Sequence, residues 1–225
     1  WIFALLALDA GAYQVPEGTQ YTRETIIEAI VSAQGEDGGF SLTGDALDAD
    51  ITAMALQALA PYADGQAEVI DRALAALSAS KCADGCFASW GAENAESTAQ
   101  VVMALCALGI DPAADERFCK EGGSAVTALL GFRVEDGSFA HVGGTSDAMA
   151  SEQSLQALEA LRRFYAGEKC FFDMTDAGAP VQWTADSAAA EETAGVPAAV
   201  YMAAGAAVVV AAGIVIVRKG RGSHE

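Results

Sequence analysis

Hydrophobic residues follow two different patterns along the chain, and both predict helices. Some segments have an apolar stripe opposite a charged face, as in 22–33, where four aliphatic side chains share one stripe (Ile26, Ile27, Ile30 and Val31). Others are rich in Ala, Leu and Met and almost free of charge, which is typical of a buried helix. The amphipathic helices are predicted at 22–33, 67–79 and 124–130, and the apolar ones at 1–10, 50–59, 96–108 and 150–164, the last with a charged end.

The alternation of the two kinds of helix predicts the fold. An outer ring of amphipathic helices around an inner ring of apolar helices would satisfy both patterns. We therefore expect an all-α fold, an α/α toroid of helical hairpins with repeats of about fifty residues. The visible helices amount to roughly half of a six-hairpin ring. Because residues 1–10 begin as an apolar helix without an initiator Met or a signal peptide, we expect the N-terminal part of the toroid to be missing.

A short phrase, Asp-Gly-small-Phe, occurs three times and marks the joints of the repeat. The copies end in Asp37-Gly38-Gly39-Phe40, Asp84-Gly85-Cys86-Phe87 and Asp136-Gly137-Ser138-Phe139. Gly supplies a positive φ and Asp bonds the following amides, so each copy is predicted to be a turn whose Phe inserts between helices. Each is followed by a carboxylate and then a hydroxyl two residues on: Asp50 and Thr52, Glu96 and Thr98, Glu152 and Ser154.

The C-terminal part of the chain has a different composition. Residues 177–197 are rich in Ala, Thr and acids and are predicted to be a flexible spacer. Residues 198–217 carry no charge and are long enough to cross a bilayer, and residues 218–225 are basic. The sequence thus predicts a single transmembrane helix, with the toroid outside the cell and a cytoplasmic tail. The alternative is a buried helix of a soluble domain.

The charge of the chain restricts its partners. Twelve Lys and Arg against 31 Asp and Glu give a formal net charge of −19. Such a polyanion repels phosphate backbones, so no nucleic-acid partner is expected. The acids are spread along the chain, which favours a solvated surface over a cation-binding role.

The five cysteines do not form a zinc signature, and neither a metal nor a cofactor is expected. Cys82 and Cys86 bracket the second turn and could close a small disulfide ring. Cys119 and Cys170 follow helices and could pair, whereas Cys106 is expected to be a buried thiol. Five reduced thiols are the alternative.

Several stretches carry a resemblance to a known family. The sequence Gln34-Gly-Glu-Asp37-Gly38-Gly39-Phe40 resembles the repeat of squalene cyclases and protein prenyltransferases, with Phe in place of Trp. Lys81 and Arg133 stand at the position of the Gln in the other two copies. Three stretches look similar to toroid domains of surface proteins of Gram-positive bacteria: residues 50–62, 88–100 and 149–153. The resemblance implies a terpenoid cyclase/prenyltransferase-like toroid over residues 1–176 but is weak for activity.

The resemblance also invites a test for catalytic residues. Triterpene cyclases of the protonating type carry Asp-x-Asp-Asp-Thr-Ala; Asp48 and Asp50 match, but Ile51 replaces the last Asp, so a helix-capping role is favoured. A prenyltransferase zinc site needs a His, and His141 and His224 are expected on opposite sides of the membrane. No catalytic residue is therefore assigned.

Candidate site residues come from the parallel starts of the apolar helices. Asp50, Glu96 and Glu152 would converge at one mouth of the toroid, and loop residues would lie nearby: Asp48, Trp90, Glu93 and His141. Carboxylates beside an aromatic platform suit a sugar-binding or sugar-cleaving cleft. Clustered carboxylates also suit a calcium site. The third interpretation is helix capping repeated with the repeat.

These observations lead to a functional prediction. We expect a membrane-anchored protein, a bacterial surface protein as the resemblance implies, whose non-catalytic toroid binds a ligand or partner at that mouth. The ligand would be a glycan, a protein or, as the resemblance implies, a corrinoid. The alternative is an extracellular enzyme acting on a glycan or an isoprenoid through the carboxylates Asp48, Asp50, Glu96 and Glu152. A third possibility is a spacer that displays another domain.

Overall fold

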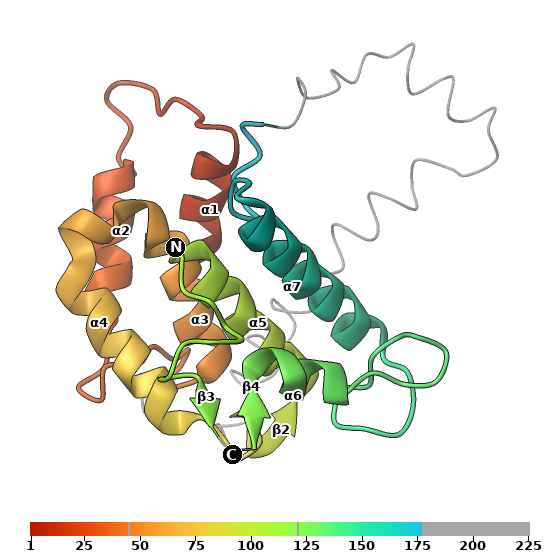
Figure 1. Cartoon of the computed structure of the whole chain (residues 1–225). Coiled ribbons are helices and arrows are strands. Elements are labelled where there is room, and N and C mark those ends of the chain that lie inside the picture. The colour runs from red at the N-terminus through yellow and green to blue at the C-terminus, as the bar shows by residue number, and fades with distance from the viewer. Residues whose placement is uncertain (45, 121, 177–225) are drawn as a thin grey trace, which may run out of the picture. The chain divides into compact units, whose positions relative to one another are not determined.

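The computed structural model describes residues 1–44, 46–120 and 122–176, and residues Trp1–Asp176 form one compact unit. About half of the described residues are helical (Figure 1). The helices are α1 (Ile2–Ala10), α2 (Arg23–Val31), α3 (Ala49–Leu59), the short 3-10 helix η1 (Ala60–Tyr62), α4 (Ala63–Ser80), α5 (Ala95–Ala107), α6 (Ala125–Gly131) and α7 (Ala148–Ala166). Within residues 1–176, each segment whose hydrophobic pattern predicts a helix contains one.

The prediction of an all-α toroid of helical hairpins is wrong. The structure is mixed, since two antiparallel strand pairs join helices in the second half of the unit. One pair is β1 (Phe87–Ser89) with β2 (Ala92–Asn94), and the other is β3 (Cys119–Lys120) with β4 (Gly123–Ser124). Hydrophobic periodicity identified the helices, but these strands span only two or three residues each, too few to produce a period of two.

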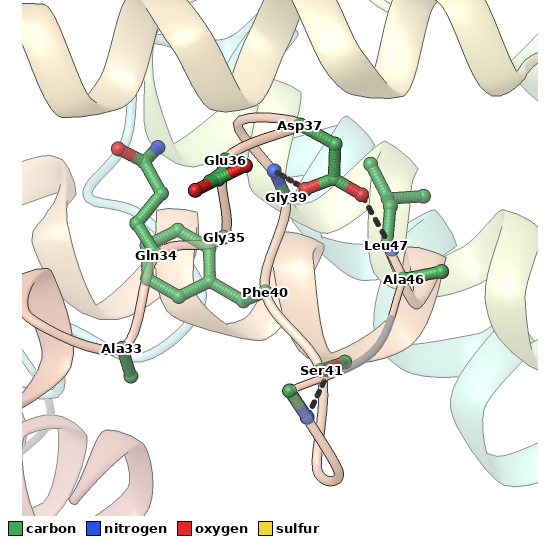
Figure 2. Close-up of a pocket in the computed structure, with 11 residues that line it drawn as sticks. Ala33, Gln34, Gly35, Glu36, Asp37, Gly39, Phe40, Ser41, Ala46 and Leu47 are labelled. Atoms are coloured by element: carbon green, nitrogen blue, oxygen red, sulfur yellow. Dashed lines mark hydrogen bonds between the residues drawn. The ribbon is translucent and has the colours of Figure 1, made fainter.

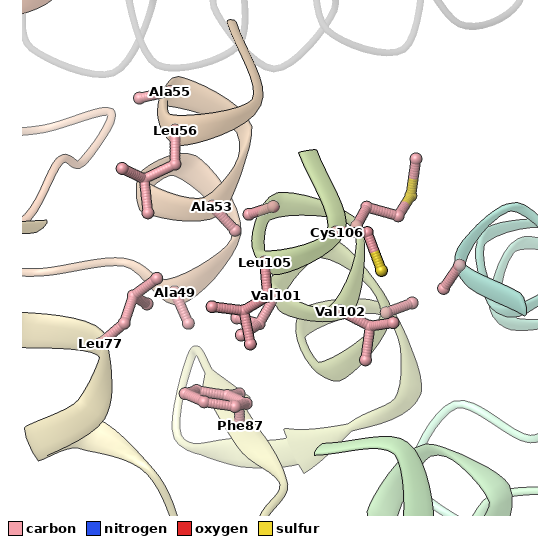
Figure 3. Close-up of a cluster of buried hydrophobic side chains, with 14 of the residues drawn as sticks. Ala49, Ala53, Ala55, Leu56, Leu77, Phe87, Val101, Val102, Leu105 and Cys106 are labelled. Carbon is pink, nitrogen blue, oxygen red and sulfur yellow. The ribbon is translucent and has the colours of Figure 1, made fainter. Parts of the chain in front are cut away.

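Helix α5 occupies the centre of the unit, between α3 and α7 (Figure 1). Eleven of its thirteen residues are buried. Figure 3 shows the ring of Phe87 beneath Val101 and Leu105 of α5, with Leu77 of α4 beside it. The small side chains of Ala99 and Ala104 are fully buried as well. A helix buried on nearly all sides is what the pattern of 96–108 predicts, since Glu96 at its start is the one charged residue.

The three Asp-Gly turns have the same hydrogen bonds. In each copy the amide of the first turn residue donates to the carbonyl of the fifth: Gly35 to Gly39 at 2.8 Å, Cys82 to Cys86 at 3.0 Å and Val134 to Ser138 at 2.9 Å. The Asp carboxylate then accepts the amide two residues on, at 2.9, 3.1 and 2.9 Å from Asp37, Asp84 and Asp136. The predicted structural role of the turns is confirmed, because the central Gly of each copy has a φ between 87° and 95°.

A second repeated contact attaches each turn to its helix. The amide of the turn Phe donates to a helix hydroxyl: Phe40 to Thr52 at 2.8 Å, Phe87 to Thr98 at 3.1 Å and Phe139 to Ser151 at 2.9 Å. The third hydroxyl is thus Ser151, not the predicted Ser154. Consequently Met149, and not Glu152, stands where Asp50 and Glu96 stand in the other copies.

No described helix is both long and apolar enough to cross a membrane. The longest, α7, carries charge at Glu159, Arg162 and Arg163. The predicted span at 198–217, the spacer at 177–197 and the tail at 218–225 lie outside the described residues. The prediction of a single-pass membrane anchor, with the domain outside the cell and a cytoplasmic tail, is corrected accordingly: the structure does not support it.

Candidate functional site

A pocket of about 320 Å³ lies where α3, α5 and α7 begin, next to the β1–β2 hairpin. Four of the residues that the sequence singles out line it, although they come from three separate segments: Asp50, Trp90, Glu96 and His141. The remaining lining residues are Met54, Ser89, Ala92, Asn94, Met149 and Gln153. Because one pocket touches the first turn of all three helices, these helices begin at the same end of the unit. We call this the helix-start pocket.

Capping side chains fix where each of these helices begins. Asp48 accepts the amides of Asp50 at 2.9 Å and Ile51 at 3.1 Å. Asn94 and Asp147 cap α5 and α7 in the same way. The carboxylate of Asp48 therefore has a structural role, worth about 1 kcal/mol to the helix. It does not line the pocket.

Asp50 is the most unusual group in the pocket. Its Oδ1 atom is buried and has no hydrogen-bond partner. Burial raises the pKa of this carboxyl, and the nearby charges of Asp48 and Glu96 raise it further. The hydroxyls of Ser97 and Ser89 oppose the rise in pKa, but neither makes a hydrogen bond of ordinary geometry to it. Two hydroxyls therefore lie near the Asp50 carboxyl, although its buried Oδ1 atom makes no hydrogen bond of ordinary geometry.

Ser89 is a second unsatisfied group on the same wall. The residue is only 8% exposed, and its Oγ has no partner. Strand β1 buries alternate side chains, so Phe87 enters the core and Ser89 faces the pocket. The sequence does not indicate Ser89 as a site residue, because the three-residue strand that places it inward is too short to show an alternating pattern.

Glu96 and His141 form a pair across the pocket. His141 Nδ1 lies 2.8 Å from Glu96 Oε2, and the carbonyl of His141 accepts the amide of Ala95 at 2.9 Å. The Glu96 side chain is largely buried, whereas half of the His141 side chain is exposed. The backbone contact holds the histidine loop against the start of α5.

Trp90 stands at the tip of the β1–β2 hairpin with 86% of its surface exposed. Trp90 and Gly91 have φ values of 54° and 84°, as in a two-residue turn that normally selects Asn and Gly. A bulky residue in this left-handed region costs about 1–2 kcal/mol. The hairpin therefore carries an exposed aromatic ring where the fold would favour a smaller residue.

The structure leaves two other candidates outside the pocket. Glu93 is exposed on the other face of the hairpin, beside Cys82 and Cys86. Glu152 points to solvent and accepts a hydrogen bond of 2.8 Å from Gln156. The shift in register explains this, because Met149 takes the position expected for Glu152.

Three glutamines link the central helices below the pocket. Gln57 Nε2 donates to Gln100 Oε1 at 2.9 Å, and Gln100 Nε2 donates to Gln153 Oε1 at 3.0 Å. Gln57 and Gln100 are buried, and Gln153 lines the pocket. This row cannot be recognised in the sequence, since the three glutamines stand at different distances from their turns. A row of paired amides fixes the helices that carry the pocket.

A larger pocket, of about 420 Å³, surrounds the first turn, but its Asp37 and Ser41 side chains already bind backbone amides of the same loop. Figure 2 shows the Asp37 carboxylate between the amides of Gly39 and Leu47, at 2.9 and 2.8 Å. The amide of Gly44 likewise donates to Ser41 Oγ. A third pocket, of about 490 Å³, contains Asp9, which is bound by Arg23 at 2.7 Å and Tyr62 at 2.8 Å. The Asp37 and Asp9 carboxylates thus already bind groups of the protein itself.

The five cysteines are free thiols in the structure, so the two possible pairings, Cys82 with Cys86 and Cys119 with Cys170, are not formed in it. Burial raises the pKa of the Cys82 and Cys86 thiols. It also raises the pKa of the Cys106 thiol to about 12, which agrees with a buried, unreactive group.

Among the described residues, one group has three metal-binding atoms close together, namely Cys82, Cys86 and Glu93. The acids of the helix-start pocket do not form such a group in that part of the chain. A calcium site there would need more converging oxygens.

No model of a known protein family matches the chain, and no curated protein matches it either. The resemblance to squalene cyclases and prenyltransferases therefore stays a prediction.

Proposed function

We propose that the chain is a non-catalytic binding domain whose helix-start pocket takes a neutral sugar or an amino sugar. The observation that carries the proposal is the pair of buried, unpartnered atoms, Asp50 Oδ1 and Ser89 Oγ, beside the exposed ring of Trp90. These are the parts that sugar recognition uses: acceptors for hydroxyls and an aromatic face for the ring.

The unpartnered atoms give a reason for binding. A buried polar group without a hydrogen bond costs about 1–3 kcal/mol. A ligand hydroxyl that donates to Asp50 Oδ1 would remove this cost, and a second hydroxyl could pair with Ser89 Oγ. The pocket volume of about 320 Å³ is at the small end for ligand pockets, which favours one or two sugar rings over a large cofactor.

The charges of the pocket select among ligands. Asp50 and Glu96 line it together, with His141 as the sole basic side chain among the lining residues. An anionic ligand would be repelled by both carboxylates. A neutral sugar is tolerated, and the ammonium group of an amino sugar would be attracted.

A titration tests this proposal directly. Glucose, galactose, N-acetylglucosamine and glucosamine are added to the purified chain while tryptophan fluorescence is followed, with calorimetry on any sugar that responds. We expect at least one of them to bind with a Kd of about 1 mM, equivalent to about −4 kcal/mol. A Trp90→Phe variant isolates the signal of Trp90 from that of the other tryptophans.

Two substitutions and one control assign the site. Asp50→Asn and Trp90→Ala should each weaken binding about tenfold, the effect of 1.4 kcal/mol. Glu152→Gln, which changes an exposed acid outside the pocket, should leave the Kd unchanged. The proposal fails if no sugar gives a saturable response at ten times the expected Kd, or if Glu152→Gln weakens binding as much as Asp50→Asn does.

A specific observation also favours a second candidate, hydrolysis of a glycosidic bond. The raised pKa of the Asp50 carboxyl suits a general acid, and the neighbouring Glu96 could act as the second carboxylate. Release of nitrophenol from nitrophenyl glycosides would reveal such an activity, which Asp50→Asn should abolish. Binding without release supports the non-catalytic proposal.

A further inference from the structure

We propose that Cys82, Cys86 and Glu93 form a binding site for a thiophilic divalent cation, with zinc as the reference ion. The two sulfur atoms and a carboxylate oxygen lie within 4.8 Å of one another. The site is separate from the helix-start pocket, since none of its three residues lines that pocket.

The second turn and the hairpin bring these residues together. The turn closes Cys82 on Cys86 through the 3.0 Å backbone hydrogen bond between them. Glu93 lies opposite Ala88 in the β1–β2 register, and Cys86 precedes Ala88 by two residues. Cys86 and Glu93 therefore share one face of the hairpin as diagonal neighbours. Backbone contacts therefore set the relative positions of the three residues.

The first and third Asp-Gly turns show that the fold does not require these three residues. The positions of Cys82 and Cys86 hold Gly35 and Gly39 in the first copy and Val134 and Ser138 in the third, with the same backbone hydrogen bonds. Glu93 precedes the N-cap Asn94, and the residues that precede the other caps are Leu47 and Ser146. In the first copy this position packs against the turn as well, since a Cβ on Gly39 would lie 2.6 Å from that of Leu47. The second copy alone places a metal-binding side chain at all three positions.

The ligand set suits zinc. Thiolates bind zinc at about 2.3 Å and carboxylates at about 2.0–2.2 Å, so a tetrahedral site holds its ligand atoms about 3.5–3.8 Å apart. Small side-chain rotations would bring atoms within 4.8 Å to that spacing. Cys86 is 1% exposed, whereas Glu93 is open to solvent. Three protein ligands with one accessible side leave the fourth position for water.

Binding is a simple exchange of protons for the metal. Each thiol loses its proton to solvent as its sulfur forms a bond to the cation, so two S–H bonds break and two S–Zn bonds form. The Glu93 carboxylate adds a third bond without releasing a proton. No electron is transferred, and no oxidant or reductant is consumed.

Cobalt and zinc titrations of the reduced full chain test the proposal. Cobalt should give a thiolate-to-metal charge-transfer absorption that saturates at one ion per chain, and zinc should remove it. A variant with the third copy's residues, Cys82→Val with Cys86→Ser and Glu93→Ser, should lose the absorption and bind zinc at least about 100-fold more weakly. Because the third turn folds with these residues, the variant should keep its cooperative thermal unfolding.

Single substitutions complete the test. Glu93→Ser alone should weaken zinc binding about 10- to 100-fold while the cobalt–thiolate absorption persists. Cys119→Ser is the matched control, with a half-buried thiol outside the cluster, and should change nothing. The proposal is overturned if the reduced chain gives no cobalt–thiolate absorption, if the folded triple variant binds zinc as tightly as the natural chain, or if Cys119→Ser removes the absorption.

Discussion

The first and second Asp-Gly turns have the same backbone and differ in chemistry. Both close with an amide-to-carbonyl bond, both place an Asp oxygen on the amide two residues on, and both bury a Phe. Around the first turn the corresponding positions hold Gly35, Gly39 and Leu47, and the Asp37 carboxylate is bound by the amides of Gly39 and Leu47. Around the second they are two thiols and Glu93, and the hairpin that follows carries Trp90 and Ser89 to the pocket.

This difference separates what builds the fold from what performs a function. The shared Asp, Gly and Phe are explained by backbone conformation and burial alone. Nothing in the fold requires Cys82, Cys86 and Glu93, nor an exposed Trp90 at a position that favours Gly or Asn. Functional candidates in a repeat therefore lie where its copies differ.

The largest expected effect on the free energy of unfolding comes from the Phe that the turns share. Phe87→Ala and Phe40→Ala each remove a buried ring and should lower the free energy of unfolding by about 3–5 kcal/mol. The measurement is urea denaturation of the two variants. Similar losses would support equivalent roles, whereas a loss under 1 kcal/mol for either would break the equivalence.

The central glycines test how closely each turn is packed. Gly85 and Gly137 have φ values of 95° and 91°, so alanine costs about 1–2 kcal/mol in either through backbone strain. A Cβ on Gly85 would also lie 2.7 Å from the backbone of Ser124, whereas one on Gly137 meets only the end of the Arg133 side chain at 3.4 Å. Gly85→Ala should therefore cost about 1–3 kcal/mol more than Gly137→Ala in the same assay. Equal losses of unfolding free energy in the two variants would mean that β4 does not pack closely against the second turn.

Substituting the hydroxyl that accepts the hydrogen bond of the Phe amide should have a smaller effect on the free energy of unfolding. Thr98→Val leaves the buried amide of Phe87 without an acceptor and should cost about 1–3 kcal/mol. Thr98→Ser keeps the hydroxyl, as Ser151 does in the third copy, and should cost about 0.8 kcal/mol for the lost methyl group. Denaturation midpoints distinguish the two, and an equal loss for both would assign the effect to packing.

The smallest expected effect is a gain in stability at Asp50. A first-turn acid stabilises a helix by about 0.3–1 kcal/mol, but an unpartnered buried charged atom costs about 1–3 kcal/mol, so Asp50→Asn should stabilise the chain by about 1 kcal/mol. That corresponds to a Tm about 2–4 °C higher at pH 7.

The pH dependence follows from the raised pKa of the Asp50 carboxyl. The folded state holds this proton more tightly than the unfolded state, so the stability of the natural chain falls as pH rises from the ordinary value of 3.8 through the raised folded value. The Asp50→Asn variant has no carboxyl to ionise at this position. The difference in Tm between the variant and the natural chain should therefore grow as pH rises between these two pKa values. An advantage that is constant with pH would contradict the burial of an unpartnered carboxylate.

The sequence could predict the helices because each is long enough to show a period. It could predict that Asp50, Glu96, Trp90 and His141 lie together, because helices that repeat in one direction begin at one end. It could not place the strand pairs, whose two or three residues are too short to alternate. It misplaced Glu152, since the third copy offers hydroxyls at both Ser151 and Ser154, and only the bond from Phe139 decides between them.

The sequence did not reveal the proposed ligand set, Cys82, Cys86 and Glu93, for a different reason. Cys82 and Cys86 are close in sequence, but Glu93 joins them only through the register of the hairpin. A search for paired cysteine and histidine motifs cannot find a ligand set completed by strand pairing.

The position of the binding site at the helix starts is tested most directly by amide chemical shifts. A ¹H–¹⁵N titration with whichever sugar binds, or with N-acetylglucosamine otherwise, reports on every pocket at once. The expected result is saturable shifts at Asp50, Ser89 and His141, with the amides of Gly39 and Leu47 unchanged. Shifts confined to the first turn, or no saturable shift at the helix starts, would contradict the assignment of the site.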